Sequence, residues 1–170
     1  GSAINLPGGE IFTSLQTGVI DATEWVGPYN DLTFGLHQVA KYYYYPGWQE
    51  PGPTLEFIIN KDAYEQLPPD LKEIVRAAAR TVNDDLLSEY TAKNNAALKE
   101  LVEVHNVELR RLPDDVLAAL KIISEEVIAE IPGDDPLAQK IYKSYIEYRD
   151  SIESYQDISE RAYINARAAD

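Results

Sequence analysis

Apolar residues in the second part of the chain recur three and four positions apart, which is the spacing of one face of an α-helix. The longest such run begins at Pro69 or Asp70 and reaches about His105 without an internal proline or glycine. Its apolar positions are Leu71, Ile74, Val75, Ala78, Ala79, Val82, Leu86, Leu87, Tyr90, Ala97, Leu98, Leu101 and Val102. A continuous helix of about 35 residues is roughly 50 Å long. Because that length exceeds the diameter of a small domain, we expect the helix over about 69–105 to bridge two lobes or lie against a partner.

The pattern after this run predicts a short strand and then more helix. "VELRRL" has the composition of a short strand. A proline-aspartate pair then opens a helix predicted from Val116 to about Ile131, and a last helical stretch is predicted from Leu137 to about Asp157. "PGDDP" between them is interpreted as a solvated loop, because it does not match the twelve-residue calcium-binding pattern.

The first 60 residues have a different texture, with short apolar runs separated by glycine and proline. "GGEIFTSLQTGV" predicts a short helix that Gly18 caps. "VIDATEWV" alternates between apolar and polar residues and predicts a strand that a Gly-Pro pair ends. A helical start in "LTFGLHQVAK" leads into the four tyrosines Tyr42–Tyr45, which favour a strand. "TLEFIIN" (Thr54–Asn60) gives the clearest strand prediction, and its apolar run indicates burial on both faces.

These textures predict one α/β domain with a strand-containing ligand-site region over residues 1–60 and a mainly helical region over 61–170. A length of 170 residues suits one domain with a sizeable core. No apolar run approaches the roughly 20 residues of a membrane-spanning helix. The net charge of −14 argues against binding of nucleic acid or anionic lipid. The lack of cysteine excludes disulfides and thiolate chemistry.

Candidate chemistry lies in the first 50 residues, where acids and amides stand beside tryptophans. Glu24 precedes Trp25, and "GWQEPG" carries Trp48, Gln49 and Glu50. A carboxylate oxygen, an amide oxygen and a backbone carbonyl together suit a hard cation. Aromatic walls with a few polar groups are also typical of small-molecule pockets. The alternative is structural, with Glu24 paired to a basic side chain and Trp48 in the core.

The sequence offers little that suggests catalysis. His37 and His105 are far apart along the chain, and neither has a second histidine at metal-ligand spacing. Packing is favoured for His37, and for His105 a place near the end of the long helix, where a cation is favoured. No histidine or lysine is close in sequence to Glu24 or Gln49 to act as a general base. We therefore expect a protein that is not an enzyme.

The residues that carry these features resemble a known family. "GGEIFTSLQTGVIDATEWVGPYND" resembles the segment "GGEIyxALqxGviDaxE" of TRAP transporter solute-binding proteins, the periplasmic receptors of sodium-driven organic-acid importers. "AKYYYYPGWQEPGPTLEFIINKDAYEQLP" is similar to the branch that binds 2-oxo acids and related monocarboxylates. The long helix, "LPDDVLAAL" and "SERAY" are similar to the C-terminal part of the family. The resemblance spans essentially the whole chain and is specific over residues 8–60.

The resemblance implies a periplasmic-binding-protein-like fold of two α/β lobes, of which this chain is roughly the C-terminal half, rich in helix. The family arginine that clamps the ligand carboxylate lies before the "GGEI" segment. No arginine precedes Arg76 here, so the resemblance implies an incomplete site within this chain.

The resemblance also implies the residues of a ligand site. A sodium or calcium ion would be bound by the Glu24 carboxylate, the Trp25 backbone carbonyl and Gln49. The pocket walls and polar contacts would be Trp25, Asn30, Tyr44, Tyr45 and Trp48.

The function implied is that of a periplasmic solute receptor. It would bind a small 2-oxo or 2-hydroxy carboxylate with the cation and hand it to the membrane subunits of a TRAP transporter. The alternative is a helical interaction module with no ligand of its own, which self-associates through the long amphipathic helix. Exposed apolar surface on such a chain would drive a homodimer or a swapped oligomer.

Overall fold

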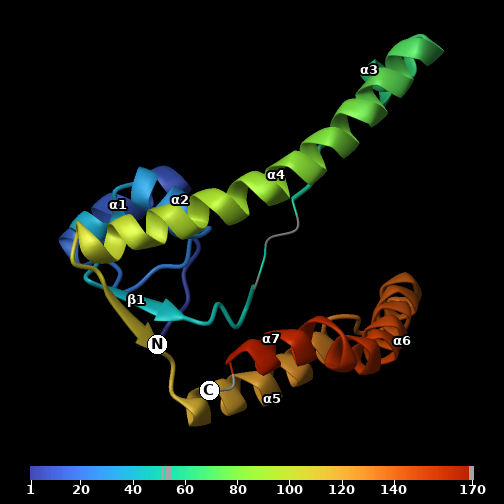
Figure 1. Cartoon of the computed structure of the whole chain (residues 1–170). Helices are drawn as coiled ribbons and strands as arrows, with labels where there is room; N and C mark the ends of the chain where they lie inside the picture. Colours follow the sequence, from blue (N-terminus) through green and yellow to red (C-terminus); the bar gives the residue numbers. More distant parts are fainter. Residues whose placement is uncertain (51, 53–54, 169–170) are drawn as a thin grey trace. The chain divides into compact units, whose positions relative to one another are not determined.

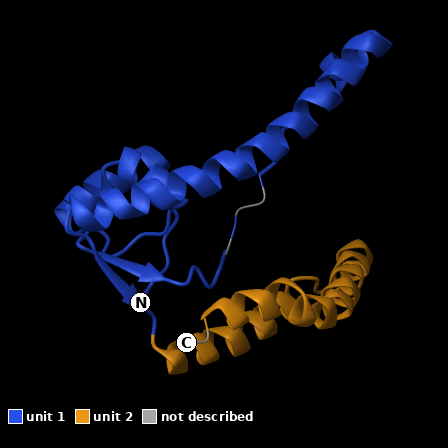
Figure 2. Ribbon diagram, in the orientation of Figure 1, with its two compact units in different colours: residues 1–112 blue, residues 113–170 orange. Residues whose placement is uncertain are grey.

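The computed structural model describes residues 1–50, 52 and 55–168, and these form two compact units, residues 1–112 and 113–170 (Figure 2). The elements of the first unit are α1 (Gly8–Thr17), α2 (Pro28–Thr33), the 3₁₀ helix η1 (Leu36–Gln38), β1 (Tyr42–Tyr45), α3 (Lys61–Glu65), α4 (Pro69–Glu103) and β2 (Glu108–Arg111). The elements of the second unit are α5 (Asp114–Glu130), α6 (Pro136–Ile158) and α7 (Glu160–Ala168) (Figure 1).

Helix α1 forms where the sequence predicts it. Ile11 is the buried residue of its apolar face. Gly18 ends the helix at φ 72°, and its N–H donates to the Leu15 carbonyl at 3.2 Å. This left-handed conformation is one that glycine adopts without steric cost, which confirms the predicted cap.

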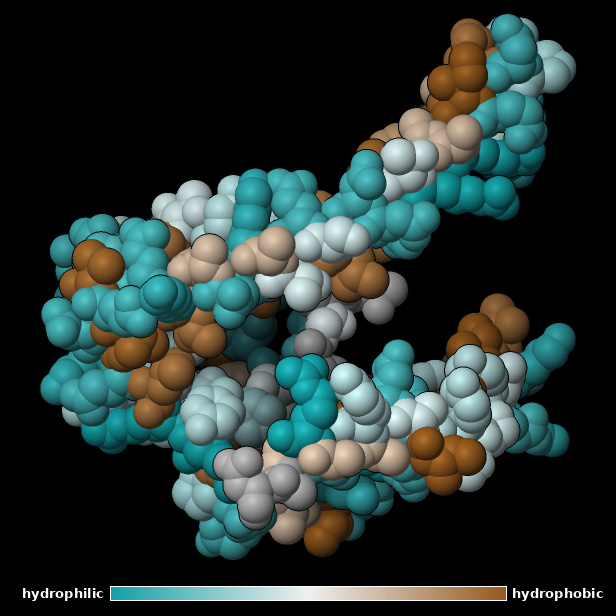
Figure 3. Space-filling model, in the orientation of Figure 1, coloured by the Kyte–Doolittle hydropathy of each residue, from teal (hydrophilic) through white to brown (hydrophobic). Residues whose placement is uncertain are grey.

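The long helix is α4, with 35 residues, and it confirms the helix predicted over about 69–105, while its bridging role stays a prediction. Its C-terminal half packs against α2 and buries Ala97 and Leu101. Its N-terminal half leaves Ile74 61% exposed and Val82 60% exposed. Figure 3 shows hydrophobic side chains gathered at that end of the helix. The apolar stripe of α4 therefore extends into its N-terminal half, where the other described residues leave these side chains exposed.

The tyrosine run and the "VELRRL" segment form the two predicted strands, and they pair with each other. Strands β1 and β2 are parallel, with Tyr42 opposite Glu108 and Tyr45 opposite Arg111. Lys41, just before β1, forms an ion pair with Glu108 at 2.6 Å. Parallel pairing requires a crossover connection, and here the connection includes α3 and α4.

Two predicted strands are wrong. Residues 19–26 and 55–60 have no ladder hydrogen bonds, and Thr54 lies outside the described residues. Phe57 and Ile58 are 71% and 80% exposed, so the expected burial on both faces is also wrong. The physical reason is that a strand needs a pairing partner, and within the described ranges the sheet consists of β1 and β2 alone.

The Gly-Pro pair after residue 26 begins an element rather than only ending one. Pro28 occupies the first position of α2. A proline fits there because the N–H groups of the first helical turn have no acceptor within the helix, so a residue without an N–H loses no hydrogen bond. Its fixed φ angle is also close to the helical value. The chain therefore turns directly from the Glu24-Trp25 segment into a short helix.

The three helices of the second unit confirm the helical pattern of the C-terminal region. Asp135 caps α6, since its Oδ1 accepts from the N–H groups of Leu137 and Ala138 at 2.7 and 2.9 Å. The predicted loop before it contains Gly133 at φ 47°. Apolar side chains on these helices are exposed, among them Ile123 at 53%. None of the helices in the described ranges has the length and apolarity needed to cross a membrane.

Candidate functional site

A pocket of about 340 Å³ in the first unit brings together several of the predicted site residues. Its lining residues are Glu24, Trp25, Val26, Asn30, Glu50, Leu55 and Tyr90. Its volume lies in the range of roughly 300–1,000 Å³ that is usual for small-molecule sites. The lining combines apolar and aromatic surface with carboxylates, an amide and a phenol, which suits a small polar ligand.

The indole of Trp25 is held by packing on both α1 and the end of α2. It stacks on Phe34, with ring centroids 5.1 Å apart and an interplanar angle of 30°. The ring also lies over Gly8, where an added Cβ would be 2.7 Å from the Cη2 atom of Trp25. The first glycine of the "GGEI" segment is therefore required for this close approach. Because Trp25 is fixed, the backbone of Glu24 beside it is fixed as well.

Negative charge surrounds the Glu24 carboxylate. The pKa of Glu24 is raised, first by partial burial and then by the charges of Glu50 and Asp31. The part of the chain that the structure describes forms no ion pair with Glu24, so the structural alternative of a basic partner is not seen there. A carboxylate among other acids favours binding of a cation.

Asp31 is a buried acid next to this site, with 7% of its surface exposed. Its Oδ2 accepts a hydrogen bond from the Tyr43 hydroxyl at 2.5 Å, which ties α2 to β1. Burial raises the pKa of Asp31, and the hydrogen bond from Tyr43 opposes that rise. Its Oδ1 has no hydrogen-bond partner among the described residues.

The fit of a cation to this site can be tested on its oxygen atoms. The Oδ1 atom of Asn30 is buried and accepts no hydrogen bond from the described residues. Together with the Glu24 carboxylate it gives the oxygen chemistry that sodium and calcium prefer. No group of three or more acidic or histidine side chains within the described ranges is arranged to hold a metal. A cation here would need further oxygens from backbone carbonyls, the ligand or additional protein groups.

Helix α2 is joined to α4 by a polar and aromatic seam. The Tyr29 N–H, one of the free donors in the first turn of α2, donates to Asn94 Oδ1 at 2.9 Å. The Tyr29 ring meets the Tyr90 ring edge-on, with centroids 6.0 Å apart. Asn30 Nδ2 donates to the Tyr90 hydroxyl oxygen at 3.4 Å. These contacts hold both Asn30 and Tyr90 in the pocket wall.

Four residues that line the pocket were not among the predicted site residues, namely the apolar Val26 and Leu55 and the polar Glu50 and Tyr90. Tyr90 belongs to the apolar stripe of the long helix in the sequence, and nothing local distinguishes it from its neighbours on that stripe. Glu50 follows the predicted ligand Gln49 directly, and the "GWQEPG" cluster was the signal that could have found it.

The remaining predicted site residues do not line this pocket. Gln49 is exposed beside Glu50, and Tyr44, Tyr45 and Trp48 are 51%, 47% and 45% exposed. Their roles in ligand or metal binding stay predictions.

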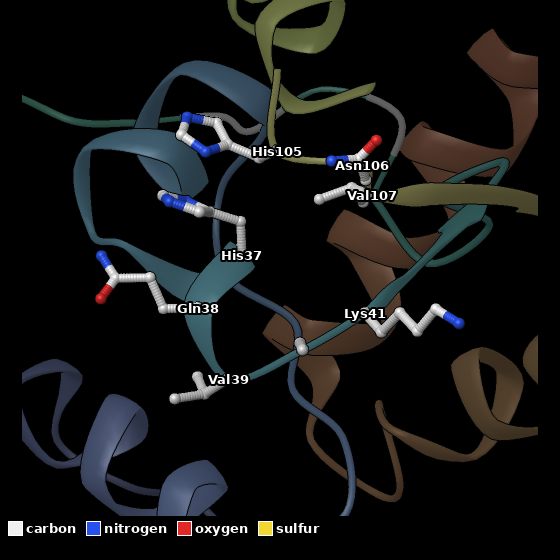
Figure 4. Close-up of a pocket in the computed structure, with 8 residues that line it drawn as sticks. His37, Gln38, Val39, Lys41, His105, Asn106 and Val107 are labelled. Atoms are coloured by element: carbon white, nitrogen blue, oxygen red, sulfur yellow. The ribbon is translucent and has the colours of Figure 1, made fainter. Parts of the chain in front are cut away.

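A second pocket, of about 250 Å³, is formed around the two histidines (Figure 4). The rings of His37 and His105 have centroids 4.0 Å apart and an interplanar angle of 31°. His105 Nε2 lies 3.5 Å from a carboxylate oxygen of Glu100. Burial, and then the charge of His105, lowers the pKa of His37. The histidines meet because each lies shortly before one of the paired strands β1 and β2, a relationship that their sequence separation conceals.

Comparison with known proteins gives consistent matches. A family model described as "Bacterial extracellular solute-binding protein, family 7" matches residues 1–133. The chain is 38% identical over 160 residues to a monocarboxylate 2-oxoacid-binding periplasmic protein of Nostoc sp. (strain PCC 7120), covering 94% of this chain and 44% of that protein. It is 29% identical over 143 residues to the ectoine-binding periplasmic protein TeaA of Halomonas elongata, covering 76% of this chain and 38% of that protein.

Solved structures show the same relationship. A TRAP transporter solute-binding protein from Bordetella bronchiseptica matches with a TM-score of 0.89 and 31% identity, covering 98% of this chain and 51% of its own. That structure is a dimer of mixed occupancy, with copurified calcium and picolinate in one active site. A TRAP periplasmic solute-binding protein from Chromohalobacter salexigens, at 21% identity and a TM-score of 0.74, shares the fold and is covered over 47% of its length. The chain thus spans about half the length, or less, of the proteins it matches.

Proposed function

The chain belongs to family 7 of the bacterial extracellular solute-binding proteins, the TRAP transporter receptors, and from this membership we propose that it forms part of a periplasmic receptor for a small 2-oxo or 2-hydroxy carboxylate, bound together with a cation. Members of this family are solute-binding receptors rather than enzymes, as the sequence indicated. The proposal takes the ligand class from the 2-oxoacid-binding relative and the cation from the calcium in the Bordetella protein.

The observation that carries the proposal is the setting of Glu24. Its carboxylate stands at a pocket of suitable volume, and the charges that act on it are the negative ones of Glu50 and Asp31. An organic anion would be repelled there unless a cation stood between them, because the cation is the largest local charge. Sodium or calcium, when bound, would supply this neutralisation at the Glu24 carboxylate.

Residues of this chain would contribute part of the cation site. The Glu24 carboxylate and the Trp25 backbone carbonyl are the proposed oxygen donors, with the Trp25 ring fixed against Gly8 and Phe34. Gln49 is proposed as a third donor from the family resemblance. An arginine upstream of Gly1 in the intact receptor would clamp the ligand carboxylate, since its planar fork matches two carboxylate oxygens.

The intact receptor is proposed to deliver its ligand to the membrane subunits of a TRAP transporter. Because the chain spans 44% of the 2-oxoacid-binding relative, we place it in the C-terminal part of a two-lobed protein. The exposed apolar half of α4 would then lie against the remainder of the receptor, which would bury residues such as Ile74.

Calorimetry on the intact receptor tests this function directly. After removal of metal ions by a chelator, pyruvate should bind weakly or not at all, and addition of calcium or sodium should restore binding. Glu24→Ala should abolish the cation-dependent part. Glu126→Ala, an exposed acid of α5 far along the chain from the pocket residues, is the matched control and should bind as the wild type does. Binding that ignores both the cation and Glu24→Ala would contradict the proposal.

A second behaviour, self-association of the 170-residue chain, is favoured by its exposed apolar residues. Ile74 on α4 and Ile141 on α6 are each 61% exposed. Such surface is usually covered by another protein segment. Sedimentation of this chain alone should therefore show dimers or larger species, and a monomer over a wide concentration range would exclude this behaviour.

A further inference from the structure

We propose that Tyr90 on α4 donates a hydrogen bond from its phenolic hydroxyl to an oxygen of the bound ligand, and so helps to determine which anions the pocket accepts. The inference rests on the proposed function, because it takes the pocket beside Glu24 to be the ligand site. It adds a ligand-contacting residue from the long helix to a site otherwise built from the segment over residues 24–30 and from residues 50 and 55.

The position of Tyr90 is fixed by the packing of α4. Tyr90, Asn94, Ala97 and Leu101 follow one another at spacings of three and four residues, so they share one helix face. Ala97 and Leu101 are buried, and Asn94 accepts the hydrogen bond from α2. The ring of Tyr90 is half-buried and is held edge-on by Tyr29. The phenol is therefore preorganised at the pocket wall, which reduces the entropy cost of ligand binding.

The hydrogen bonds of the Asn30–Tyr90 pair leave one donor unused. The Tyr90 oxygen accepts from Asn30 Nδ2 at 3.4 Å. A phenol also has one O–H to donate, and no acceptor for it is found within the described ranges. Since polarised hydrogen bonds strengthen one another, the amide that donates to this oxygen makes the O–H a better donor. An acceptor oxygen on a ligand in the pocket would accept this O–H and extend the series of hydrogen bonds from Asn30 through Tyr90 to the ligand.

The charges of the pocket make such a donor useful. The ionisable residues that line it with Tyr90 are Glu24 and Glu50, which as carboxylates only accept hydrogen bonds. The nearby ammonium of Lys93 does not line the pocket, and it is engaged by Glu89 and by the Tyr29 ring. The Tyr90 O–H is therefore a neutral donor in the pocket wall for a ligand oxygen that faces neither the cation nor the proposed upstream arginine.

The test compares two tyrosine variants of the intact receptor by calorimetry with pyruvate in saturating calcium. Tyr90→Phe keeps the ring and removes the hydroxyl, and its affinity should fall about tenfold or more, as for loss of a hydrogen bond to a charged group. Tyr29→Phe removes a hydroxyl from the same seam, one that accepts from Lys93 at 3.3 Å and does not line the pocket. Its affinity should stay within about twofold of the wild type. Melting temperatures should show that both variants are folded.

The outcomes separate this inference from the proposed function. Wild-type protein that binds no 2-oxo or 2-hydroxy acid in the presence of a cation would refute the proposed function. Wild-type binding with an unchanged Tyr90→Phe affinity would leave that function intact and overturn the inference, since the hydroxyl would then serve only Asn30. Equal losses in Tyr90→Phe and Tyr29→Phe would also overturn it, because they would point to packing of α2 on α4.

Discussion

The indole of Trp25 occupies the space where a side chain on Gly8 would begin, since a Cβ atom there would lie 2.7 Å from Cη2 of the ring. This contact joins the start of α1 to the residue that follows Glu24. It explains why a carboxylate and a large aromatic stand next to each other in this segment. The aromatic is packed for support, and the acid beside it remains free to face the pocket.

Gly8→Ala should therefore displace the indole and disturb the site. We expect a loss of about 1–3 kcal/mol in the free energy of unfolding, as for overpacked positions, together with weaker ligand binding. Gly9→Ala is the matched control, because a Cβ on Gly9 meets nothing within 4 Å. Denaturant unfolding of both intact-receptor variants, followed by tryptophan fluorescence, measures the difference. Equal stability of the two variants would contradict the packing role.

Ligand binding should weaken on acidification, at a higher pH than for an ordinary glutamate. The cation requires the ionised form of Glu24, and the pKa of this carboxyl is raised from 4.5 by burial, Glu50 and Asp31. The calcium affinity of the ligand-free receptor, measured by calorimetry at each pH of a series, should thus fall with a midpoint above 4.5. Glu50→Gln removes one of the charges that raise this pKa and should move the midpoint lower. A midpoint that does not respond to Glu50→Gln would show that the two carboxylates are not coupled.

The hydrogen bond from Tyr43 to Asp31 should contribute measurably to stability. Tyr43→Phe would leave a buried carboxylate oxygen without its donor, and we expect a loss of about 1–3 kcal/mol in the free energy of unfolding. Tyr42→Phe, on the same strand with an exposed ring, should change this free energy by less than about 0.5 kcal/mol. Urea titrations of the intact receptor with each substitution give both values.

Asp31→Asn adds a pH test of the same group. Because the folded-state pKa of Asp31 is raised, the native state holds its proton more tightly, and the charged form costs stability above that pKa. The stability of Asp31→Asn relative to the wild type should therefore increase as the pH rises from below 3.8 towards neutrality. A relative stability that falls with pH would reverse the assigned direction.

The histidine pair should make the free energy of unfolding rise with pH in the mildly acidic range, whereas the charge on Asp31 makes it fall with pH. The pKa of His37 is lowered from 6.5, so below that pH the unfolded chain binds its proton more readily than the native one. The free energy of unfolding should fall as the pH drops through 6.5 towards the lowered value. His37→Asn should flatten this part of the curve, measured as melting temperature against pH. An unchanged slope in His37→Asn would assign the dependence to other groups.

The sequence predicted best the elements that depend on contacts between residues close together along the chain. The helix over 69–105 follows from a local periodicity, and α4 matches it closely. The strands predicted over 19–26 and 54–60 do not form over the described residues 19–26 and 55–60, because pairing depends on a partner elsewhere in the protein and local alternation does not supply one. Among the described residues, the two strands that form are β1 and β2, and they are each other's pairing partners.

The residues of the candidate site also differ in whether they are close together in sequence or are brought together only by the fold. Glu24 and Trp25 are adjacent in sequence, so their local pattern indicated a site there, and Asn30 was implied by the family resemblance; all three line the pocket. Tyr90 reaches the pocket from a position 60 residues beyond Asn30, and only the docking of α2 on α4 brings it there. His37 and His105 also meet through long-range pairing, which composition and spacing cannot reveal.

The parallel pairing of β1 with β2 has a consequence for the order of events in biogenesis. Tyr42 is matched with Glu108, so the tyrosine strand is synthesised long before the segment that will hydrogen-bond to it. The intervening chain contains the whole of α4, and closing so large a loop is entropically costly until the helix has formed and docked. A nascent chain therefore cannot pair its tyrosine strand until residues up to Arg111 have been synthesised, so β1 and β2 join late in the folding of the first unit.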